Sequence, residues 1–247
     1  MYNMPNNRPY GGRGGFGSRY QYQTLPQGYE VSQEQSASLI SKVMGLLAFS
    51  FLFAAIGTFV GFILIPPTSL GPYLIVAIGG LVVLFILHIA IQKPGLNLFL
   101  LYLFTFLEGM ALGPLVGLYI TSGYSNIVGE AFLITAVTSL ALSAYAWTTK
   151  RNFSNLGGYL FFGLILLIVA GIAGFFFHST LFELIISVVG IAIFSGYVLF
   201  YVQRAKYMAD TMPNAIGLTV SIFITVMNLF LYILEFLSIV QGGNRRR

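Results

Sequence analysis

Seven long apolar runs, separated by short polar breaks, constrain this sequence more than any other feature. A hydrocarbon core about 30 Å thick takes about 20 apolar residues per helical span, and each run is close to that length. Transmembrane β-strands would instead alternate apolar and polar residues in short segments, and that alternation is absent. The sequence therefore predicts an all-α, polytopic membrane protein, a seven-transmembrane-helix bundle with spans at residues 46–65, 73–91, 98–120, 127–147, 156–177, 181–202 and 216–240.

Composition agrees with this prediction and excludes a soluble enzyme. Only 8% of the 247 residues are charged and 57% are hydrophobic, whereas about 25% of residues are charged in an ordinary soluble domain. The chain has no cysteine, which excludes a disulfide framework, a thiolate metal site and a cysteine nucleophile. The net charge of +5 lies in loops and tails, where it reports membrane orientation. We expect the lipid bilayer as a partner and no nucleic acid.

Two tails flank the expected membrane domain at residues 31–240. Residues 1–30 are rich in Gly, Tyr, Arg and Asn and lack the apolar residues that could offset chain entropy, so we expect a disordered cytoplasmic tail with no cleaved signal sequence. Ser32 and Gln35 have capping-box spacing, so the first helix is expected to begin before the bilayer. Residues 241–247 form a basic C-terminal tail.

The distribution of Lys and Arg predicts the orientation, because cytoplasmic loops retain positive charge during insertion. Lys93, Lys150, Arg151, Arg204 and Lys206 all fall in breaks that share one side with the N-terminus. The breaks on the other side contain no Lys or Arg. The N-terminus is therefore predicted to be cytoplasmic.

The last apolar run leaves two alternatives. A seventh full span places Arg245, Arg246 and Arg247 outside, against the rule that orients the other loops. A re-entrant hairpin would keep both of its ends in the cytoplasm. Residues 216–240 are long enough to cross the hydrocarbon core, so we favour the full span.

Small residues predict close packing of the third span. Pro114 removes a backbone donor there and should kink the helix. Gly57 and Gly61 form a short small-residue face on the first span, and such faces let membrane helices approach closely. We favour tight packing over a hinge. The third span carries a longer face of the same kind at Gly109, Gly113 and Gly117.

Glu108 is the ionisable residue that lies nearest the centre of an apolar run. Placing a carboxylate there costs about 2.5–3.5 kcal/mol on insertion scales. It directly precedes the Gly109 face, so its side chain is predicted to point into the bundle. No Lys or Arg lies mid-membrane to pair with it. We expect Glu108 to handle ions or protons, with a structural hydrogen bond as the alternative.

Other ionisable residues lie near span ends. Three carboxylates near the outer ends of spans would form an acidic mouth that concentrates cations. We favour the simpler interpretation that these carboxylates are solvated at the helix ends. The two histidines, His88 and His178, have no companion at metal-ligand spacing, so we expect no bound metal and no cofactor. The three carboxylates concerned are Glu130, Glu183 and Glu235.

Enzyme chemistry has little support in the sequence. Ser195, followed by Gly196, would need a histidine within reach on a neighbouring helix, and both histidines lie near span ends or in a loop. The chain has no HExxH pair, no paired intramembrane aspartates and no mid-membrane lysine for a Schiff base. We expect no catalytic residues.

Three segments resemble the Bax inhibitor-1 family, which includes bacterial members and the TMBIM proteins. Phe104 to Leu115 contains Glu108-Gly109 and Gly113-Pro114, which is similar to the family's Glu-Gly and Gly-Pro motif. Residues 194–203 resemble its sixth-helix segment and residues 228–234 its seventh-helix ending. The resemblance implies a seven-helix bundle with the last helix near its centre, in a bacterial inner membrane.

The resemblance also implies two functions of different classes. One is a pH-sensitive calcium leak, with calcium or protons as permeant ions. The other is a non-conducting regulator that binds a membrane protein such as a quality-control protease. Family leaks carry a pair of facing aspartates, and the aligned positions here are Tyr201 and Thr225, which are uncharged near neutral pH. Any leak is therefore expected to use Glu108, with Tyr201, Thr225 and Asn228 lining the interface of the last two helices.

Overall fold

The computed structural model describes residues 33–153, 155–176 and 179–244, which form helices and no strand. The predicted tail, Ser32 and the three terminal arginines lie outside these residues. Each helix is long and apolar enough to span a membrane, which confirms the predicted all-α, seven-span architecture. The helices are α1 (Gln33–Leu64), α2 (Leu70–Ala90), α3 (Leu96–Thr121), α4 (Ser125–Thr148), α5 (Leu156–Phe176), α6 (Thr180–Ala205) and α7 (Met212–Asn244).

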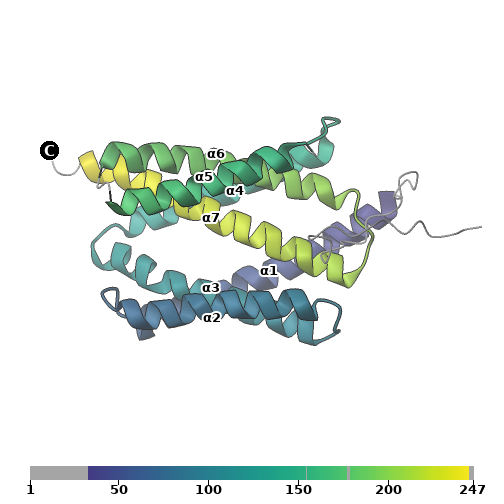
Figure 1. Ribbon diagram of the computed structural model, residues 1–247, viewed down its shortest axis with the longest axis horizontal. Coiled ribbons are helices and arrows are strands. Elements are labelled where there is room, and N and C mark those ends of the chain that lie inside the picture. The colour runs from purple at the N-terminus through teal and green to yellow at the C-terminus, as the bar shows by residue number, and fades with distance from the viewer. Residues whose placement is uncertain (1–32, 154, 177–178, 245–247) are drawn as a thin grey trace, which may run out of the picture.

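Two layers of helices enclose α7. Helices α1, α2 and α3 form one layer, α4, α5 and α6 form the other, and α7 crosses diagonally between them (Figure 1). Helix α7 contacts α1 and α3 in the first layer and α4 and α6 in the second. Phe223 and Leu229 of α7 are fully buried. The central position of the last helix, implied by the family resemblance, is therefore confirmed.

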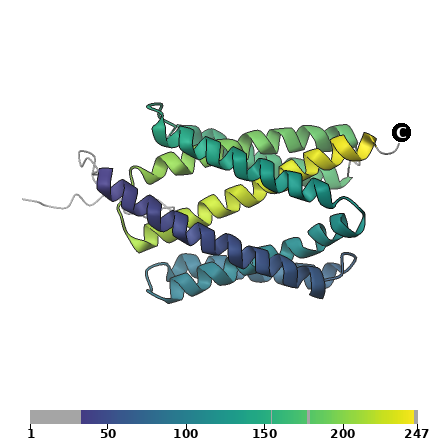
Figure 2. The ribbon, with the colours of Figure 1, turned by 180° about the vertical axis from the view of Figure 1, so that it is seen from behind.

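The re-entrant alternative for the last segment is wrong. Helix α7 is one continuous helix of 33 residues, which at 1.5 Å per residue is about 50 Å long and exceeds the hydrocarbon core. The start of α1 and the end of α7 lie at opposite ends of the bundle (Figures 1 and 2). A hairpin is excluded because the backbone has no reversal between Met212 and Asn244.

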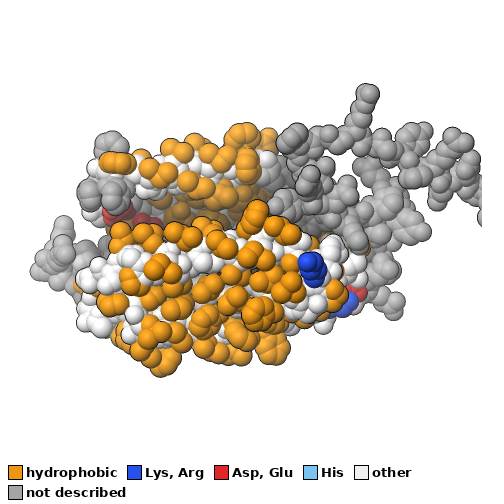
Figure 3. Space-filling model, turned by 60° about the horizontal axis from the view of Figure 1, so that its bottom comes forward, with side chains coloured by type: hydrophobic (Ala, Val, Ile, Leu, Met, Phe, Trp, Pro, Cys, Tyr) orange, Lys and Arg blue, Asp and Glu red, His pale blue; other side chains and the backbone are white. Residues whose placement is uncertain are grey.

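The outer surface is apolar over most of the helix length. The layer of α1, α2 and α3 lies at the bottom of Figure 1. Its outer face is covered by hydrophobic side chains, and the Lys and Arg side chains on this face lie toward one end (Figure 3). Ile75 and Ile89 of α2, and Phe99 of α3, are each more than half exposed. Such a surface is stable in lipid, where acyl chains are as apolar as the side chains that they cover.

Helices α1 and α3 approach each other through glycine. A Cβ atom added to Gly109 would lie 2.0 Å from the Ala54 carbonyl oxygen, and one added to Gly113 would lie 2.4 Å from the Gly61 backbone. Thr58 Oγ1 donates a hydrogen bond of 3.0 Å to the Gly109 carbonyl oxygen across this interface. The two small-residue faces thus lie against each other, and α3 remains one helix across its internal proline.

Three buried amide side chains close the turns at one end of the bundle, which we call the clamped end. Asn97 Nδ2 donates to the Ile91 carbonyl oxygen (2.9 Å) in the α2–α3 turn. Asn214 Nδ2 donates to the Ala209 carbonyl oxygen (2.8 Å) in the α6–α7 turn. Gln203 holds the α4–α5 turn in the same way. Buried polar groups are thereby satisfied where the chain leaves the helices.

An ion pair fixes the start of α1 to the α6–α7 turn at the clamped end. Lys42 Nζ lies 2.9 Å from Asp210 Oδ1. Burial raises the pKa of Asp210, but hydrogen bonds from Lys42 and Ser38 and the Lys42 charge outweigh it, so the pKa lies below its usual value. Ser36 Oγ also donates to the Lys206 carbonyl oxygen at 3.3 Å. The two layers are thus joined where α7 begins.

Gly113→Ala should destabilise the bundle, because the added methyl group would meet the Gly61 backbone at 2.4 Å. Overpacking of this kind costs about 1–3 kcal/mol. Thermal unfolding of the purified protein in detergent should show a lower midpoint. Gly129→Ala is the matched control, because no atom lies within 4 Å of its added Cβ. Equal midpoints for the two variants would contradict the proposed importance of the contact.

Candidate functional site

Glu108 lies in the interface between α2 and α3. Its Oε1 atom is 3.3 Å from the position of a Cβ atom added to Gly80, a buried residue of α2. Successive residues of a helix are about 100° apart. Because Gly109 faces α1, Glu108 is turned toward α2. The absence of a side chain at Gly80 leaves the space that the carboxylate occupies.

The Glu108 carboxylate has no partner in the described part of the chain. Neither a salt bridge nor a hydrogen bond to it is found there. The side chain is only half-buried, so it is not sealed in the core. A structural hydrogen bond, the alternative interpretation of this residue, has no counterpart among the described residues. An unpaired carboxylate within a membrane span is costly, and such residues commonly mark functional sites.

The three other residues of the candidate ion pathway lie on α6 and α7. The Tyr201 ring stacks on the Tyr197 ring, with centroids 5.6 Å apart. Thr225 Oγ1 donates to the Ser221 carbonyl oxygen at 2.7 Å, and Asn228 Nδ2 donates to the Ile224 carbonyl oxygen at 2.8 Å. These two polar groups are satisfied within α7, and in the described chain no hydrogen bond joins either of them to Glu108.

The three carboxylates near the opposite end do not form a single cluster. Glu130 Oε2 accepts a hydrogen bond of 2.6 Å from Gln241, which links α4 to α7. Glu183 of α6 and Glu235 of α7 are close enough for their charges to interact, and both are half-buried. No group of three or more His, Cys, Asp or Glu side chains that could hold a metal ion occurs in the described ranges.

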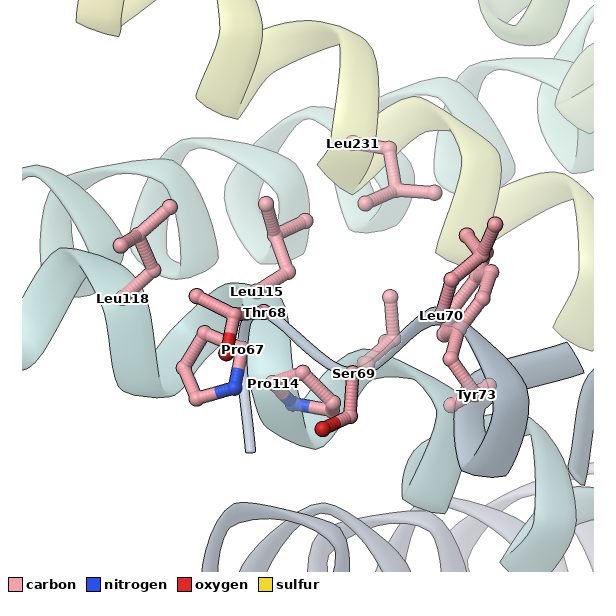
Figure 4. A pocket seen from close by; sticks show the side chains of 11 residues that line it. Pro67, Thr68, Ser69, Leu70, Tyr73, Pro114, Leu115, Leu118 and Leu231 are labelled. Atoms are coloured by element: carbon pink, nitrogen blue, oxygen red, sulfur yellow. The ribbon is translucent and has the colours of Figure 1, made fainter. Parts of the chain in front are cut away.

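A groove of about 380 Å³ lies between the α1–α2 turn, α3 and α7 (Figure 4). The turn contributes Thr68 and Ser69, and α7 contributes Leu231. Most of the lining is apolar. Ala111 lines it from α3, one helical turn along that helix from Glu108. Measured along the α3 axis, the groove therefore reaches to within about 5 Å of Glu108.

A second groove of about 510 Å³ shares Leu115 and Leu118 with the first and extends toward α4, α6 and the end of α7. Its lining includes hydroxyl groups, on Tyr119, Ser122, Tyr124, Thr180 and Ser238. We call this end of the bundle the grooved end. Sequence reasoning missed both grooves, because their walls combine residues from helices far apart in the chain. Pro114, which lines the first groove, was the one local signal.

Comparison with known proteins places this geometry in a family. Residues 36–242 match the profile described as inhibitor of apoptosis-promoting Bax1. A membrane protein of Vibrio cholerae is 38% identical over 58% of this chain and 64% of its own length. Protein lifeguard 4 of Mus musculus is 33% identical over 69% of this chain and 70% of its own length. The Escherichia coli modulator of FtsH protease YccA is 30% identical over 78% of this chain and 86% of its own length. With its seven spans, its central α7 and this match over the whole helical bundle, the chain belongs to the Bax inhibitor-1 family.

Proposed function

We propose that this protein is a membrane-embedded regulator that binds another membrane protein, with a quality-control protease as the first candidate partner. The observation that carries the proposal is the relative named as a modulator of FtsH protease, of whose length 86% is matched. A function of this kind depends on a binding surface and requires neither catalytic residues nor a permeation path.

The geometry of α6 and α7 is consistent with this proposal. The positions aligned with the family's aspartate pair hold Tyr201, stacked on Tyr197, and Thr225, bonded within its own helix. Neither side chain carries a charge near neutral pH. Two facing carboxylates at these positions would repel each other and share a proton. This chain lacks that pair of carboxylates and retains the family's seven-helix fold.

The proposal includes a bacterial inner membrane, with the N-terminus in the cytoplasm and the C-terminus outside. Bacterial relatives support the location. The positive side chains Lys93, Lys150 and Arg151 lie in turns of the clamped end, which supports a cytoplasmic position for that end.

Side-specific labelling tests this orientation in a chain with no native cysteine. Asn244→Cys, at the end of α7, should react with an impermeant maleimide added to spheroplasts. Lys150→Cys, in the α4–α5 turn, is the matched control and should react only after the membrane is permeabilised. The reverse pattern would contradict the proposed orientation.

Removal of residues 1–28 should weaken co-purification of an FtsH-type protease by about tenfold, while membrane insertion stays intact. A tenfold loss corresponds to about 1.4 kcal/mol, which a few lost contacts can account for. Quantitative pull-down from solubilised membranes measures the effect. A Gly/Ser segment of equal length in place of the tail separates loss of sequence from loss of length. Unchanged co-purification would exclude the tail as the contact and leave the helical surface.

A cation pathway through Glu108 is the second candidate function. The observation that favours it is the half-buried carboxylate between α2 and α3, without a partner among the described residues. Such a group can bind a proton or a calcium ion in passing, because no fixed cation competes for it. The carboxylates at the grooved end would raise the local concentration of cations.

Calcium flux into liposomes, measured from acidic to neutral pH, tests this second candidate. If the pathway exists, Glu108→Gln should lower flux about tenfold or more, since loss of about 1.4 kcal/mol of attraction is tenfold in rate. Glu130→Gln removes one of the three carboxylates at the grooved end, where it is bonded to Gln241, and should lower flux much less than Glu108→Gln does. A silent wild type, with pH-dependent flux only in the Tyr201→Asp, Thr225→Asp double variant, would reject conduction and favour the regulator.

A further inference from the structure

Two cationic residues lie in the α4–α5 turn of the clamped end, and a third lies at the adjoining end of α6. Lys150 and Arg151 are exposed in this turn. The Arg204 guanidinium, in the last turn of α6, lies 6.0 Å from the centroid of the Phe200 ring. That ring packs on the first turn of α5, where a Cβ atom added to Gly157 would be 3.0 Å from it. We call Lys150, Arg151 and Arg204 the basic turn surface.

A buried glutamine fixes this surface in place. Gln203 is 3% exposed, and its side-chain amide bonds to the backbone on both sides of residue 152. Its Oε1 atom accepts from the Phe153 N–H, and its Nε2 atom donates to the Arg151 carbonyl oxygen. The Arg151 N–H donates to Thr149 Oγ1 at 3.3 Å. The turn that carries two of the cations is therefore anchored to α6, beside Arg204.

Neighbouring charges leave the two turn cations, Lys150 and Arg151, without a paired carboxylate among the described residues. Lys206 is not part of this surface, because its side chain contacts the end of α4. Its Nζ atom donates to the Ala146 carbonyl oxygen (2.8 Å) and lies 5.4 Å from the Trp147 ring centroid. Burial lowers the pKa of Lys206. Among the side chains that the structure describes, Asp210 is the carboxylate at this end, and it is paired with Lys42. No described carboxylate forms a salt bridge with Lys150 or Arg151.

Exposed aromatic side chains follow the α4–α5 turn on α5. Tyr159 is 78% exposed in the first turn of this helix, and Phe161 and Phe162 follow it, also exposed. A tyrosine at the end of a span is typical of the membrane interface, where headgroups meet acyl chains. One molecule with an anionic head and apolar tails would contact both parts.

We propose that the basic turn surface binds the headgroups of anionic phospholipids, with Gln203 as a positioning residue. Basic side chains beside a span attract anionic lipids, each by about fivefold in affinity. An anionic lipid would pair with the turn cations Lys150 and Arg151 and also cover the exposed aromatic side chains of α5, whereas an acidic protein segment would pair with the cations alone. This proposal is independent of whether the protein regulates a protease or conducts ions.

The single tryptophan of the chain allows a local measurement. Trp147 lies in the last turn of α4, directly before the basic turn surface. The full chain is reconstituted into mixed phosphatidylcholine and phosphatidylglycerol, with brominated acyl chains on one lipid or on the other. Bromine quenches the fluorescence of a tryptophan that it contacts, so the two series report which lipid lies beside Trp147.

Brominated phosphatidylglycerol should quench Trp147 more than brominated phosphatidylcholine at the same mole fraction, with a relative binding constant of about five or more. The Lys150→Gln, Arg151→Gln double variant should bring this ratio close to one. Lys93→Gln, which removes a cation from the α2–α3 turn, is the matched control and should keep the wild-type ratio. Gln203→Met should lower the ratio with every charge retained.

High salt should also lower the wild-type ratio, since it screens exposed charges. Equal quenching by the two lipids in the wild type would overturn the proposal and favour an acidic partner segment as the occupant. An unchanged ratio in the double variant would overturn it as well. Elution volume and the unquenched emission maximum of each variant, compared with the wild type, separate loss of lipid selectivity from misfolding.

Discussion

The contact between α1 and α3 is the interaction on which much of this fold depends. Pro114 has no N–H, so the Met110 carbonyl oxygen loses its helical partner. That oxygen lies against Gly61, where an added Cβ atom would be 2.1 Å away. Glycine at this position lets a Cα–H group approach the freed carbonyl, a contact worth about 0.5–1 kcal/mol. In lipid, where water cannot solvate a stray carbonyl, such a partner matters more than it would in water.

The same contact determines where Glu108 lies. With Gly109 and Gly113 committed to α1, the helix rotation about its axis is fixed, and the residue before Gly109 must face a different neighbour. That neighbour is α2, at Gly80. The carboxylate position thus follows from backbone packing on the adjacent face of α3. A substitution that separates α1 from α3 would therefore also displace Glu108, although no atom of Glu108 belongs to that contact.

The sequence predicts the spans well because apolar length and turn residues are local properties. It predicts α7 as a full span from the length of residues 216–240, and the structure extends this helix to Met212–Asn244. The face of Glu108 could not be predicted, because a helical position has two neighbours on a packed face and the choice between α1 and α2 is tertiary. The hydrogen bonds from buried amide side chains to the turns were missed for the same reason. In the sequence Gln203 is simply a polar residue near a helix end, and its partners lie about 50 residues earlier in the chain.

The two ends of the bundle use their polar groups differently. At the clamped end, Asn97, Gln203 and Asn214 are each 3% exposed. The side-chain amide of each forms hydrogen bonds with the backbone of a turn. The turn cations then project from a fixed backbone, and their charge is available to other molecules. At the grooved end, hydroxyl groups line a cavity of about 510 Å³ instead of holding a turn. A ligand that needs fixed positive charge therefore finds it at the clamped end, whereas one that needs hydroxyl groups beside apolar surface finds them at the grooved end.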